Sequence, residues 1–501
     1  MEMIMKKILT LIFLVAAGFL TSCTDFLDIN KDPNSPSEEN MTSDMVFPSA
    51  EMNLAVSYGD FLRIVGGYYA QHYSQLTGTS NYLDYSQFKM SATRSSGTYT
   101  QLNSRVLGNL EFVRNYASQH EDWGSYLAAT ALRAFTYQTL VDCYEQVPYR
   151  EALDATNPTP KYDEGLDIYN GILAELDAAL AKVSGNESVC TNFLLPSATA
   201  REWVSFAKAL KLKILMRMSG AANIQQQLDE LVTEGDFPTA DIAFENCWED
   251  ANGKANPFYT EEIGSYTTTQ YNVSLNLALQ ATMADCGDAR LETFFDPNSS
   301  GAYTGAISGV NFSVSASEHG AAYWCRPAVR YNSPVYLLTV AETEFFLAEY
   351  YAKKTQMTEA KAHYEAAIDA SFASAGIAGA DAVYGVGAKY EWKDAEYQRL
   401  IGTQKWIALS GTNNFEAWCE LRRLGYPAFG EKTGSDFYNV QSGALDVTTY
   451  VPGTLYTPIT VNTDLGAGKI LQRFPYANSS SSRNENTPDY KGDATPMFWV
   501  K

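Results

Sequence analysis

The sequence predicts an all-α protein built from tetratricopeptide-like helical pairs, with a large loop-rich region and minor β-strands. Hydrophobic residues recur at helical spacing in several long segments, and one pair of segments fits the tetratricopeptide pattern. From about residue 41 to residue 501, no long linker or low-complexity segment divides the chain. This length exceeds an ordinary single core, whereas a helical repeat array grows by stacking. We therefore expect one domain over residues 41–501.

Each expected helix carries apolar residues three or four positions apart. In residues 162–183, for example, Leu166, Tyr169 and Leu173 fall on one face, which predicts a helix that packs against a neighbour. Two regions, 244–320 and 425–501, are rich in Gly, Ser, Thr, Asn and Tyr and predict long loops with a few short strands. In chain order, the expected helices are residues 123–144, 162–183, 201–218, 334–353, 358–373 and 398–423.

The pair of helices within residues 344–372 fits the tetratricopeptide pattern. This pattern places small and large residues at fixed offsets, so that two antiparallel helices approach closely and bury aromatic side chains between them. Glu344 replaces the leading Trp of the pattern, and Phe372 replaces its closing Pro. A second, partial match begins at Trp203. The six positions of the first match that have the required size are Leu347, Ala348, Tyr351, Ala360, Tyr364 and Ala367.

Residues 1–22 predict a signal peptide that is removed from the mature chain. Two lysines precede the apolar run 8–20, which is shorter than the roughly 20 residues needed to span a bilayer. The run ends in Leu-Thr-Ser directly before Cys23, which is similar to the bacterial lipobox, where this cysteine carries the lipid. An ordinary signal peptide followed by a chance cysteine is the alternative. Residues 24–40 are polar and rich in turn formers, so we expect a flexible leader behind the lipidated Cys23.

The composition excludes several classes of partner. The formal net charge is −22, which argues against nucleic acid and against binding to anionic lipid through a basic patch. Neutral and cationic ligands remain compatible with this charge.

Neither a metal site nor a catalytic motif is evident in the sequence. Six cysteines beyond Cys23 are scattered without metal-like pairing, which favours buried free thiols, with one or two disulfides as the alternative. The chain has only four His, with no H-E-x-x-H, G-x-S-x-G or Walker motif, and its many carboxylates indicate no glycosidase pair without geometry. These six cysteines are Cys143, Cys190, Cys247, Cys286, Cys325 and Cys419.

Several sequence blocks have a simple structural interpretation. The block "LKLKILMRMS" predicts an amphipathic helix in which basic and apolar positions alternate. The block "ELRRLGYP" predicts a helix end, with Arg422 and Arg423 near the negative end of the helix dipole and Gly425 as the cap. The residues Trp203, Trp406 and Trp418 lie on periodic helices and are expected in the core.

These blocks, in this order, also resemble the SusD/RagB family of outer-membrane lipoproteins. The resemblance runs over nearly the whole chain, and the order and spacing of the blocks make it specific. Besides the two blocks above it rests on "TDFLDINKDPN" after the lipobox cysteine, "DCYEQVPYREAL", "TPKYDEGLDIYNGILAELDAAL", "PVYLLTVAETEFFLAEYYAK", "TQKWIALSGTNNFEAWC" and "QRFPYANSSSSRNEN".

The resemblance implies a function that composition and spacing do not show. Members of this family are lipid-anchored in the outer membrane, face the cell exterior and close as a lid over a SusC-type TonB-dependent transporter. They capture glycan oligomers, or in some branches peptides, and pass them to this transporter. We therefore expect a nutrient-binding protein that is not an enzyme. The alternatives are a RagB-like peptide-binding member, a surface-tethered glycoside hydrolase or lyase, and a pure assembly subunit.

Aromatic side chains in irregular segments are the candidate ligand contacts, because flat rings stack on sugars. Most of the 33 Tyr, 24 Phe and 8 Trp must lie in the core, so these candidates rest on their location in loops. No cofactor is expected; the turn at Asp296-Pro297-Asn298 is a candidate for a structural Ca²⁺, with a solvated turn as the alternative. The candidate ligand contacts are Tyr82, Tyr85, Trp248, Tyr259, Tyr323, Trp324 and Arg326.

Overall fold

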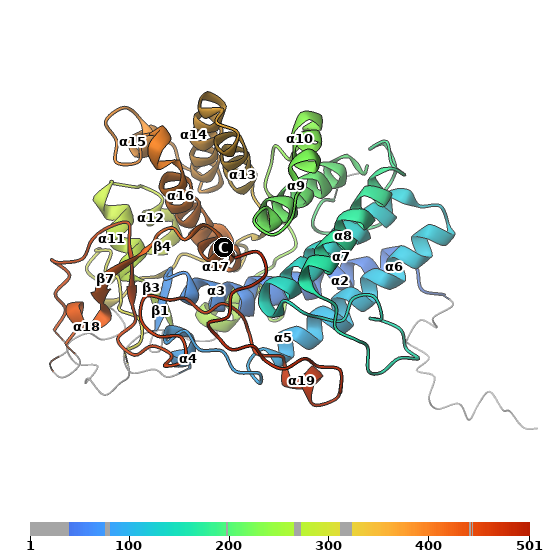
Figure 1. Ribbon diagram of the computed structural model, residues 1–501, viewed down its shortest axis with the longest axis horizontal. Coiled ribbons are helices and arrows are strands. Elements are labelled where there is room, and N and C mark those ends of the chain that lie inside the picture. Colours follow the sequence, from blue (N-terminus) through green and yellow to red (C-terminus); the bar gives the residue numbers. More distant parts are fainter. Residues whose placement is uncertain are drawn as a thin grey trace, which may run out of the picture. The chain divides into compact units, whose positions relative to one another are not determined.

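The fold is mainly helical, and its few strands are two to five residues long (Figure 1). The computed structural model describes residues 40–75, 81–196, 199–264, 272–310, 323–439, 442 and 444–500. Internal contacts make one unit of residues 43–501; of the preceding unit, 1–42, only the last three residues are described. The predicted signal peptide, Cys23 and almost all of the leader therefore lie outside the described residues. None of the described helices is long and apolar enough to cross a membrane.

The structure has helices before residue 120 that the sequence did not predict. This segment is interrupted by Pro48 and several glycines, which weaken a helical pattern. One of them, Gly66, is required by packing, since a Cβ there would lie 2.4 Å from the Phe415 backbone. The elements are α2 (Ser43–Ser57), the π-helix η2 (Tyr58–Leu62), α3 (Arg63–Tyr69), α4 (Leu83–Ser86), α5 (Ser96–Thr100), the π-helix η3 (Gln101–Leu107) and α6 (Gly108–Gln119).

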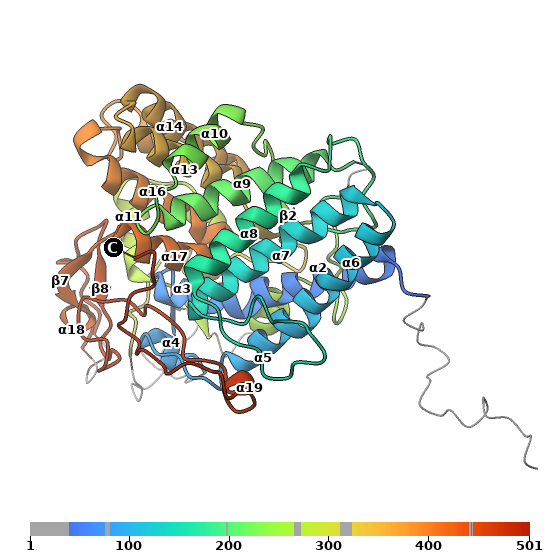
Figure 2. The same cartoon turned by 45° about the vertical axis from the view of Figure 1, so that its right-hand side comes forward.

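The middle helices confirm the predicted periodicity. Helix α7 (Trp123–Tyr144) is buried almost all round and begins at Asp122, whose carboxylate accepts the Ser125 N–H at 3.2 Å. Helices α8 (Gly165–Leu180) and α9 (Arg201–Met218) lie beside it in succession (Figure 2). Helix α10 (Gln225–Glu234), which the sequence did not predict, follows α9.

The tetratricopeptide-like pair is formed by α13 (Val340–Lys353) and α14 (Met357–Ser374). Five of the six predicted interface residues pack in one hydrophobic cluster, in which the rings of Phe345 and Tyr364 lie 6.3 Å apart. The sixth, Leu347, is buried but lies outside this cluster. The expected helix 398–423 is two helices, α16 (Tyr397–Thr412) and α17 (Asn414–Leu424), because Asn413 caps the second one.

Short strands and small helices fill the rest of the structure. Two predictions need correction here. Residues 335–338 form a strand rather than the start of a helix, and the predicted loop 244–320 contains helix α11 (Leu277–Asp285). The strands are β1 (Tyr73–Gln75), β2 (Ile242–Phe244), β3 (Val273–Leu275), β4 (Phe295–Asp296), β5 (Arg326–Pro327), β6 (Val335–Leu338), β7 (Phe429–Thr433) and β8 (Leu455–Thr457). The remaining helical elements are the π-helix η4 (Tyr259–Gly264), α12 (Leu291–Phe294), α15 (Asp381–Tyr384), the 3₁₀ helix η6 (Asp394–Glu396), α18 (Gly434–Phe437) and α19 (Asn478–Ser481).

The strands pair across large distances in the sequence. Strand β1 pairs antiparallel with β3, β2 with β6, and β4 with β5, whereas β7 and β8 are parallel. Each sheet therefore has only two strands, and its stability depends on the helices around it.

A buried network of ion pairs joins α9 to its neighbours. Lys213 Nζ lies 2.9 Å from a Glu342 carboxylate oxygen of α13 and 2.8 Å from one of Glu416 on α17. Arg217 of α9 pairs with Asp142 of α7 and again with Glu416. All five side chains are almost completely buried. The basic positions of "LKLKILMRMS" therefore do not all face solvent, and the prediction of a simple amphipathic helix is wrong for these two residues.

The network continues through α17 to the tetratricopeptide-like pair. Glu420 accepts from Arg217 at 3.0 Å and from Lys405 of α16 at 2.8 Å. Arg423 bridges Glu420 and Glu349 of α13, at 2.6 Å from each. Burial alone would raise the pKa of Glu349, but the cationic Arg423 and Lys353 lower it to about 2. Five helices thus share one set of mutually compensating charges.

Other sequence predictions about the core are confirmed. Trp203, Trp406 and Trp418 are at most 2% exposed. Gly425 ends α17 in the left-handed conformation, with a φ of 70°, and donates its N–H to the Leu421 carbonyl at 2.9 Å. All six cysteines beyond Cys23 are free thiols, four of them buried.

We predict that Arg217→Met destabilises the protein by about 3–5 kcal/mol, because it leaves Asp142, Glu416 and Glu420 buried with less compensation. Urea unfolding monitored by circular dichroism measures this loss. The matched control is Lys211→Met on the same helix, which removes a pair with the 60% exposed Asp177 and should change stability by less than about 1 kcal/mol. Equal losses in both variants would contradict the structural role of the network.

A second prediction concerns Glu51 of α2, which holds the loop after Cys190 by accepting the N–H groups of Phe193 and Leu194 at 2.7 and 3.2 Å. Burial raises the pKa of Glu51 to about 8, although these two donors lower it. The folded protein therefore holds a proton on Glu51 that the unfolded chain releases above about pH 4.5.

The free energy of unfolding should accordingly fall as pH rises from about 5 to 8, by up to about 1.4 kcal/mol per pH unit from this residue. Denaturation at a series of pH values checks this expectation. Glu51→Gln should flatten the slope, whereas Glu359→Gln, at an exposed position of α14, should leave it unchanged. An unchanged slope in Glu51→Gln would show that Glu51 does not titrate in this range.

Candidate functional site

Three tyrosines form a cluster where α3 meets α4, and we refer to Tyr68, Tyr82 and Tyr85 as the tyrosine cluster. The rings of Tyr82 and Tyr85 are stacked, with centroids 5.4 Å apart and an interplanar angle of 18°. Tyr68 lies edge-on to both, at 5.9 and 6.1 Å. Tyr85 is buried beneath the Arg94 guanidinium, whereas Tyr82 is half-buried. Tyr82 is therefore the member whose ring surface is most accessible to a ligand.

Hydrogen bonds fix the orientation of these rings. The Tyr68 hydroxyl donates to the Asn272 carbonyl at 2.6 Å. The Tyr82 hydroxyl donates to the carboxylate of Glu262, which the π-helix η4 carries. The two bonds connect residues that lie 204 and 180 positions apart in the sequence. The arrangement thus depends on the tertiary fold and not on local sequence.

Carboxylates accumulate beside the tyrosine cluster. Asp60 lies on the π-helix η2, and Glu261 and Glu262 lie on η4; π-helical turns of this kind are frequent at functional sites. Burial, together with the charges of Glu261 and Glu262, raises the pKa of Asp60 to about 7. Burial also raises the pKa of Glu262. We refer to Asp60, Glu261 and Glu262 as the acidic trio. Among the described residues, no Lys or Arg makes an ion pair with any of the three.

A second group of predicted residues, Tyr323, Trp324 and Arg326, lies in and before β5. The rings of Tyr323 and Trp324 meet edge-on at 4.9 Å. Trp324 is 3% exposed and packs on Ala306, while Tyr323 and Arg326 are half-buried. Within this group, Tyr323 and Arg326 are therefore the side chains that are partly exposed.

The strand β3 brings the two groups near one another. Asn272, just before β3, accepts the hydrogen bond from Tyr68, and Leu275 at the end of β3 donates its N–H to the Cys325 carbonyl at 3.0 Å. A strand rises about 3.3 Å per residue, so these two backbone contacts lie about 10 Å apart along β3.

The other predicted contacts have different environments. Trp248 lies after β2 and donates its indole N–H to the Phe244 carbonyl at 2.8 Å, which gives it a structural role. Tyr259 begins η4 and is half-buried, one helical turn from Glu262. It thus belongs with the tyrosine cluster by position, whereas Trp248 does not.

The oxygens of the candidate Ca²⁺ turn have donors within the protein. The Asp296 carboxylate accepts two hydrogen bonds from Arg330, at 2.7 and 3.0 Å. The Asn298 side-chain oxygen accepts from the backbone N–H groups of Ser300 and Ala302, both at 3.0 Å.

Elsewhere in the described residues, one group of side chains has metal-like spacing: Asp142, Glu416 and Cys419. The Arg217 guanidinium pairs with the carboxylates of both Asp142 and Glu416, so the positive charge of an arginine stands where a metal ion would.

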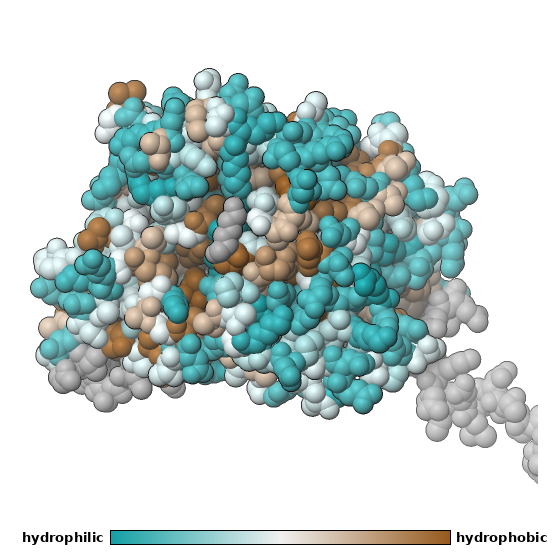
Figure 3. Space-filling view, viewed as in Figure 1, coloured by the Kyte–Doolittle hydropathy of each residue, from teal (hydrophilic) through white to brown (hydrophobic). Residues whose placement is uncertain are grey.

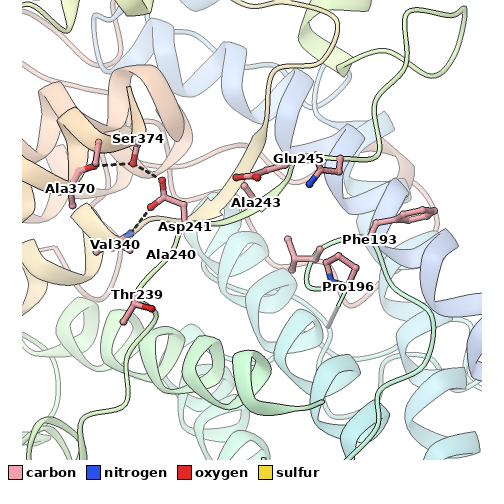
Figure 4. A pocket seen from close by; sticks show the side chains of 13 residues that line it. Phe193, Pro196, Thr239, Ala240, Asp241, Ala243, Glu245, Val340, Ala370 and Ser374 are labelled. Atoms are coloured by element: carbon pink, nitrogen blue, oxygen red, sulfur yellow. Dashed lines mark hydrogen bonds between the residues drawn. The ribbon is translucent and has the colours of Figure 1, made fainter. Parts of the chain in front are cut away.

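A cavity of about 470 Å³ lies between the loop at Phe193, strand β2 and the pair α13–α14 (Figure 4). Asp241 accepts the Val340 N–H at 2.8 Å and a hydrogen bond from the Ser374 hydroxyl, so its carboxylate is already used by the fold. Phe193, which is 40% exposed, and Glu245 are the rim residues that a ligand could contact. The cavity has one aromatic side chain and lacks the stacked rings of the tyrosine cluster.

Apolar residues also gather on the face shown in Figure 3, around the C-terminal end. A cavity of about 480 Å³ there is lined by apolar residues such as Leu421, Leu455 and Ile470. Neither Tyr nor Trp lines it, so it is a poorer match for sugar stacking than the tyrosine cluster.

Sequence reasoning missed Tyr68 and the acidic trio. Tyr68 is fully buried within a helix, and nothing in its neighbourhood in the sequence distinguishes it from a core tyrosine. Asp60, Glu261 and Glu262 are three of 58 acidic residues, and only the fold brings the first beside the other two. The aromatic candidates rest on their location in irregular segments, which does not reveal burial: Tyr85 and Trp324 are each 3% exposed.

Comparisons with known proteins identify the fold and the family. The family model described as starch-binding associating with outer membrane, a SusD-like family, matches residues 33–442. A search of curated proteins found no match. Among solved structures, a SusD homologue from Bacteroides uniformis has a TM-score of 0.74 at 20% identity, covering 91% of this chain and 100% of its own.

Two further solved structures are similar over nearly their whole length. A SusD homologue from Bacteroides thetaiotaomicron has a TM-score of 0.70 at 20% identity, covering 92% of this chain and 99% of its own. A chitin-binding SusD homologue from Flavobacterium johnsoniae has a TM-score of 0.69 at 18% identity, covering 90% and 98%. At these identities the structures establish a common fold, and the family match covers most of the sequence. The chain therefore belongs to the SusD-like family, which is described as starch-binding and associated with the outer membrane.

Proposed function

We propose that this protein captures glycan oligomers at the outer-membrane surface and delivers them, without cleaving them, to a SusC-type TonB-dependent transporter that it covers as a lid. The observation that carries the proposal is the stacked Tyr82–Tyr85 pair beside the acidic trio, in a chain of the SusD-like family. Aromatic faces stack on sugar rings, and carboxylates accept hydrogen bonds from sugar hydroxyls.

The proposed binding surface consists of side chains from other segments that lie near the two ends of β3. Tyr82 supplies the stacking face, with Tyr85 and Tyr68 as its support, and the half-buried Tyr323 and Arg326 contact the ligand further along. Tyr259 and the acidic trio complete the surface. Trp324 supports Tyr323 from within the core, and we assign no ligand contact to Trp248.

The proposed location follows from the N-terminal sequence and the family. Lipid on Cys23 anchors the protein, and residues 24–40 connect the anchor to the helical body, with the protein facing the cell exterior. Two or three acyl chains on one residue give stable anchoring, where a single chain binds only marginally.

A peptide-binding role is the second candidate, and the acidic trio favours it. Three carboxylates without a basic partner within the described residues would also attract an ammonium group on a peptide or an amino sugar. Competition between a neutral chitin oligomer and a lysine-rich peptide of similar length distinguishes the two classes, since the preferred class displaces the other.

We predict that Tyr82→Ala weakens oligosaccharide binding up to about tenfold, which corresponds to the roughly 0.5–1.5 kcal/mol of one aromatic contact. Isothermal titration calorimetry with starch- and chitin-derived oligosaccharides measures the change. The control is Tyr116→Ala, a half-buried tyrosine of α6 stacked on His120, which should bind normally. Unchanged affinity in Tyr82→Ala would place the binding surface elsewhere.

We predict that the protein leaves bound oligosaccharides intact. Prolonged incubation of the purified protein with the same oligosaccharides should return them at their original length, as measured by mass spectrometry. Release of shorter products that depends on the protein would indicate the glycoside hydrolase or lyase alternative.

The transporter partnership is tested by isolating the native protein from outer membranes with mild detergent. We expect a TonB-dependent barrel to co-purify with the wild type, and lipidation-deficient Cys23→Ala to be lost from the membrane fraction. Recovery of the wild-type protein without any barrel would argue against the lid role.

A further inference from the structure

Arg63, the first residue of α3, differs from the other buried basic residues. Six of these pair with carboxylates, and Arg422 donates to the carbonyls of Asp142 and Gln472 at 3.0 and 2.6 Å. Arg63 is only 8% exposed, yet in the described part of the chain it makes no ion pair. The six paired residues are Arg133, Lys213, Arg217, Arg290, Lys405 and Arg473.

The contacts of Arg63 leave most of its hydrogen-bonding capacity unused. Its Nε donates to the Tyr73 hydroxyl at 3.3 Å, and its guanidinium lies 5.0 Å from the centre of the Phe258 ring. Neither terminal nitrogen has a hydrogen bond to a described residue. A buried charge without a paired anion is costly, so native proteins rarely leave one uncompensated.

Arg63 lines a cavity of about 150 Å³ between α12, α14, α16 and the segment before β6. Its lining includes the hydroxyl groups of Ser333 and Ser371, and no acidic residue. The Ser371 hydroxyl accepts from Arg290 at 2.9 Å, and that of Ser333 accepts from the Arg330 N–H at 2.8 Å. In the described structure neither hydroxyl donates its own proton, so both can donate into the cavity.

Two helices also end at this cavity, next to Arg63. Helices α14 and α16 both terminate there, and the negative end of a helix dipole favours a nearby cation. This partial charge does not replace a hydrogen-bonded anion, because the terminal nitrogens of Arg63 still have no acceptor among the described residues.

We propose that this cavity binds a small oxyanion, such as phosphate, sulfate or a carboxylate group, held by Arg63 with Ser333 and Ser371 as additional donors. The planar guanidinium binds two oxygens of such a group at once. A volume of about 150 Å³ holds one ion-sized group and a few waters, each of which occupies about 30 Å³. The bound group is either a free inorganic anion or the acidic substituent of a larger molecule.

The test measures the melting temperature of the full-length protein while phosphate, sulfate or acetate replaces chloride at constant ionic strength. Binding to the folded state alone raises the melting temperature in a saturable way. Arg63→Met should not show this rise in melting temperature, because its affinity for the anion should be at least tenfold lower. Arg201→Met, which removes a 72% exposed arginine of α9, should retain it.

A second variant keeps the proposal testable if Arg63→Met does not fold. Ala328→Leu fills the cavity and leaves Arg63 in place, so it should also lose the response. A response to inorganic anions identifies a free ion as the ligand, and a response to uronic or sulfated sugars alone identifies an acidic substituent. No saturable response to any of them, or a response that persists in Ala328→Leu, would overturn the proposal.

Discussion

The fold depends on compensating buried charges more than on any single hydrophobic contact. Lys213 and Arg217 of α9 reach carboxylates on three other helices, and Glu420 extends the set to α16. Removing such charges from water is unfavourable unless every partner is in position. A shift of one helix by one turn would leave several charges unpaired, so the network restricts α7, α9, α13, α16 and α17 to one arrangement.

This constraint explains why the sequence predicts the scaffold better than the site. The blocks "LKLKILMRMS" and "ELRRLGYP" carry both the resemblance to the family and the charges of the network. Helix 123–144 was predicted with its observed bounds because its apolar residues recur at 3.6-residue spacing. The helices before residue 120 could not be predicted in this way. Residues such as Gly66 have low helix propensity, and the close packing against α17 leaves no room for a side chain there.

The candidate site follows a different logic. The irregular segment around Tyr82 and Tyr85 predicts these two residues as ligand contacts. Tyr68 and the acidic trio can be recognised as part of the candidate site only from their contacts with residues far away in the sequence. The π-helix η2 carries Asp60 beside the tyrosine cluster and is followed directly by Arg63 at the proposed oxyanion cavity. Tyr73 contacts both regions, since its ring lies 6.5 Å from that of Tyr68 and its hydroxyl accepts from Arg63. A short segment of α2–α3 therefore contributes to both binding features.

Hydrogen–deuterium exchange with a bound oligosaccharide reports the location of the ligand without any mutation. With saturating starch- or chitin-derived oligomers, we expect reduced exchange at residues 81–86, 259–264 and 323–327 together, and little change in α8–α10. Protection confined to the cavity at Phe193, or no protection at any of the three segments under saturating ligand, would contradict this expectation.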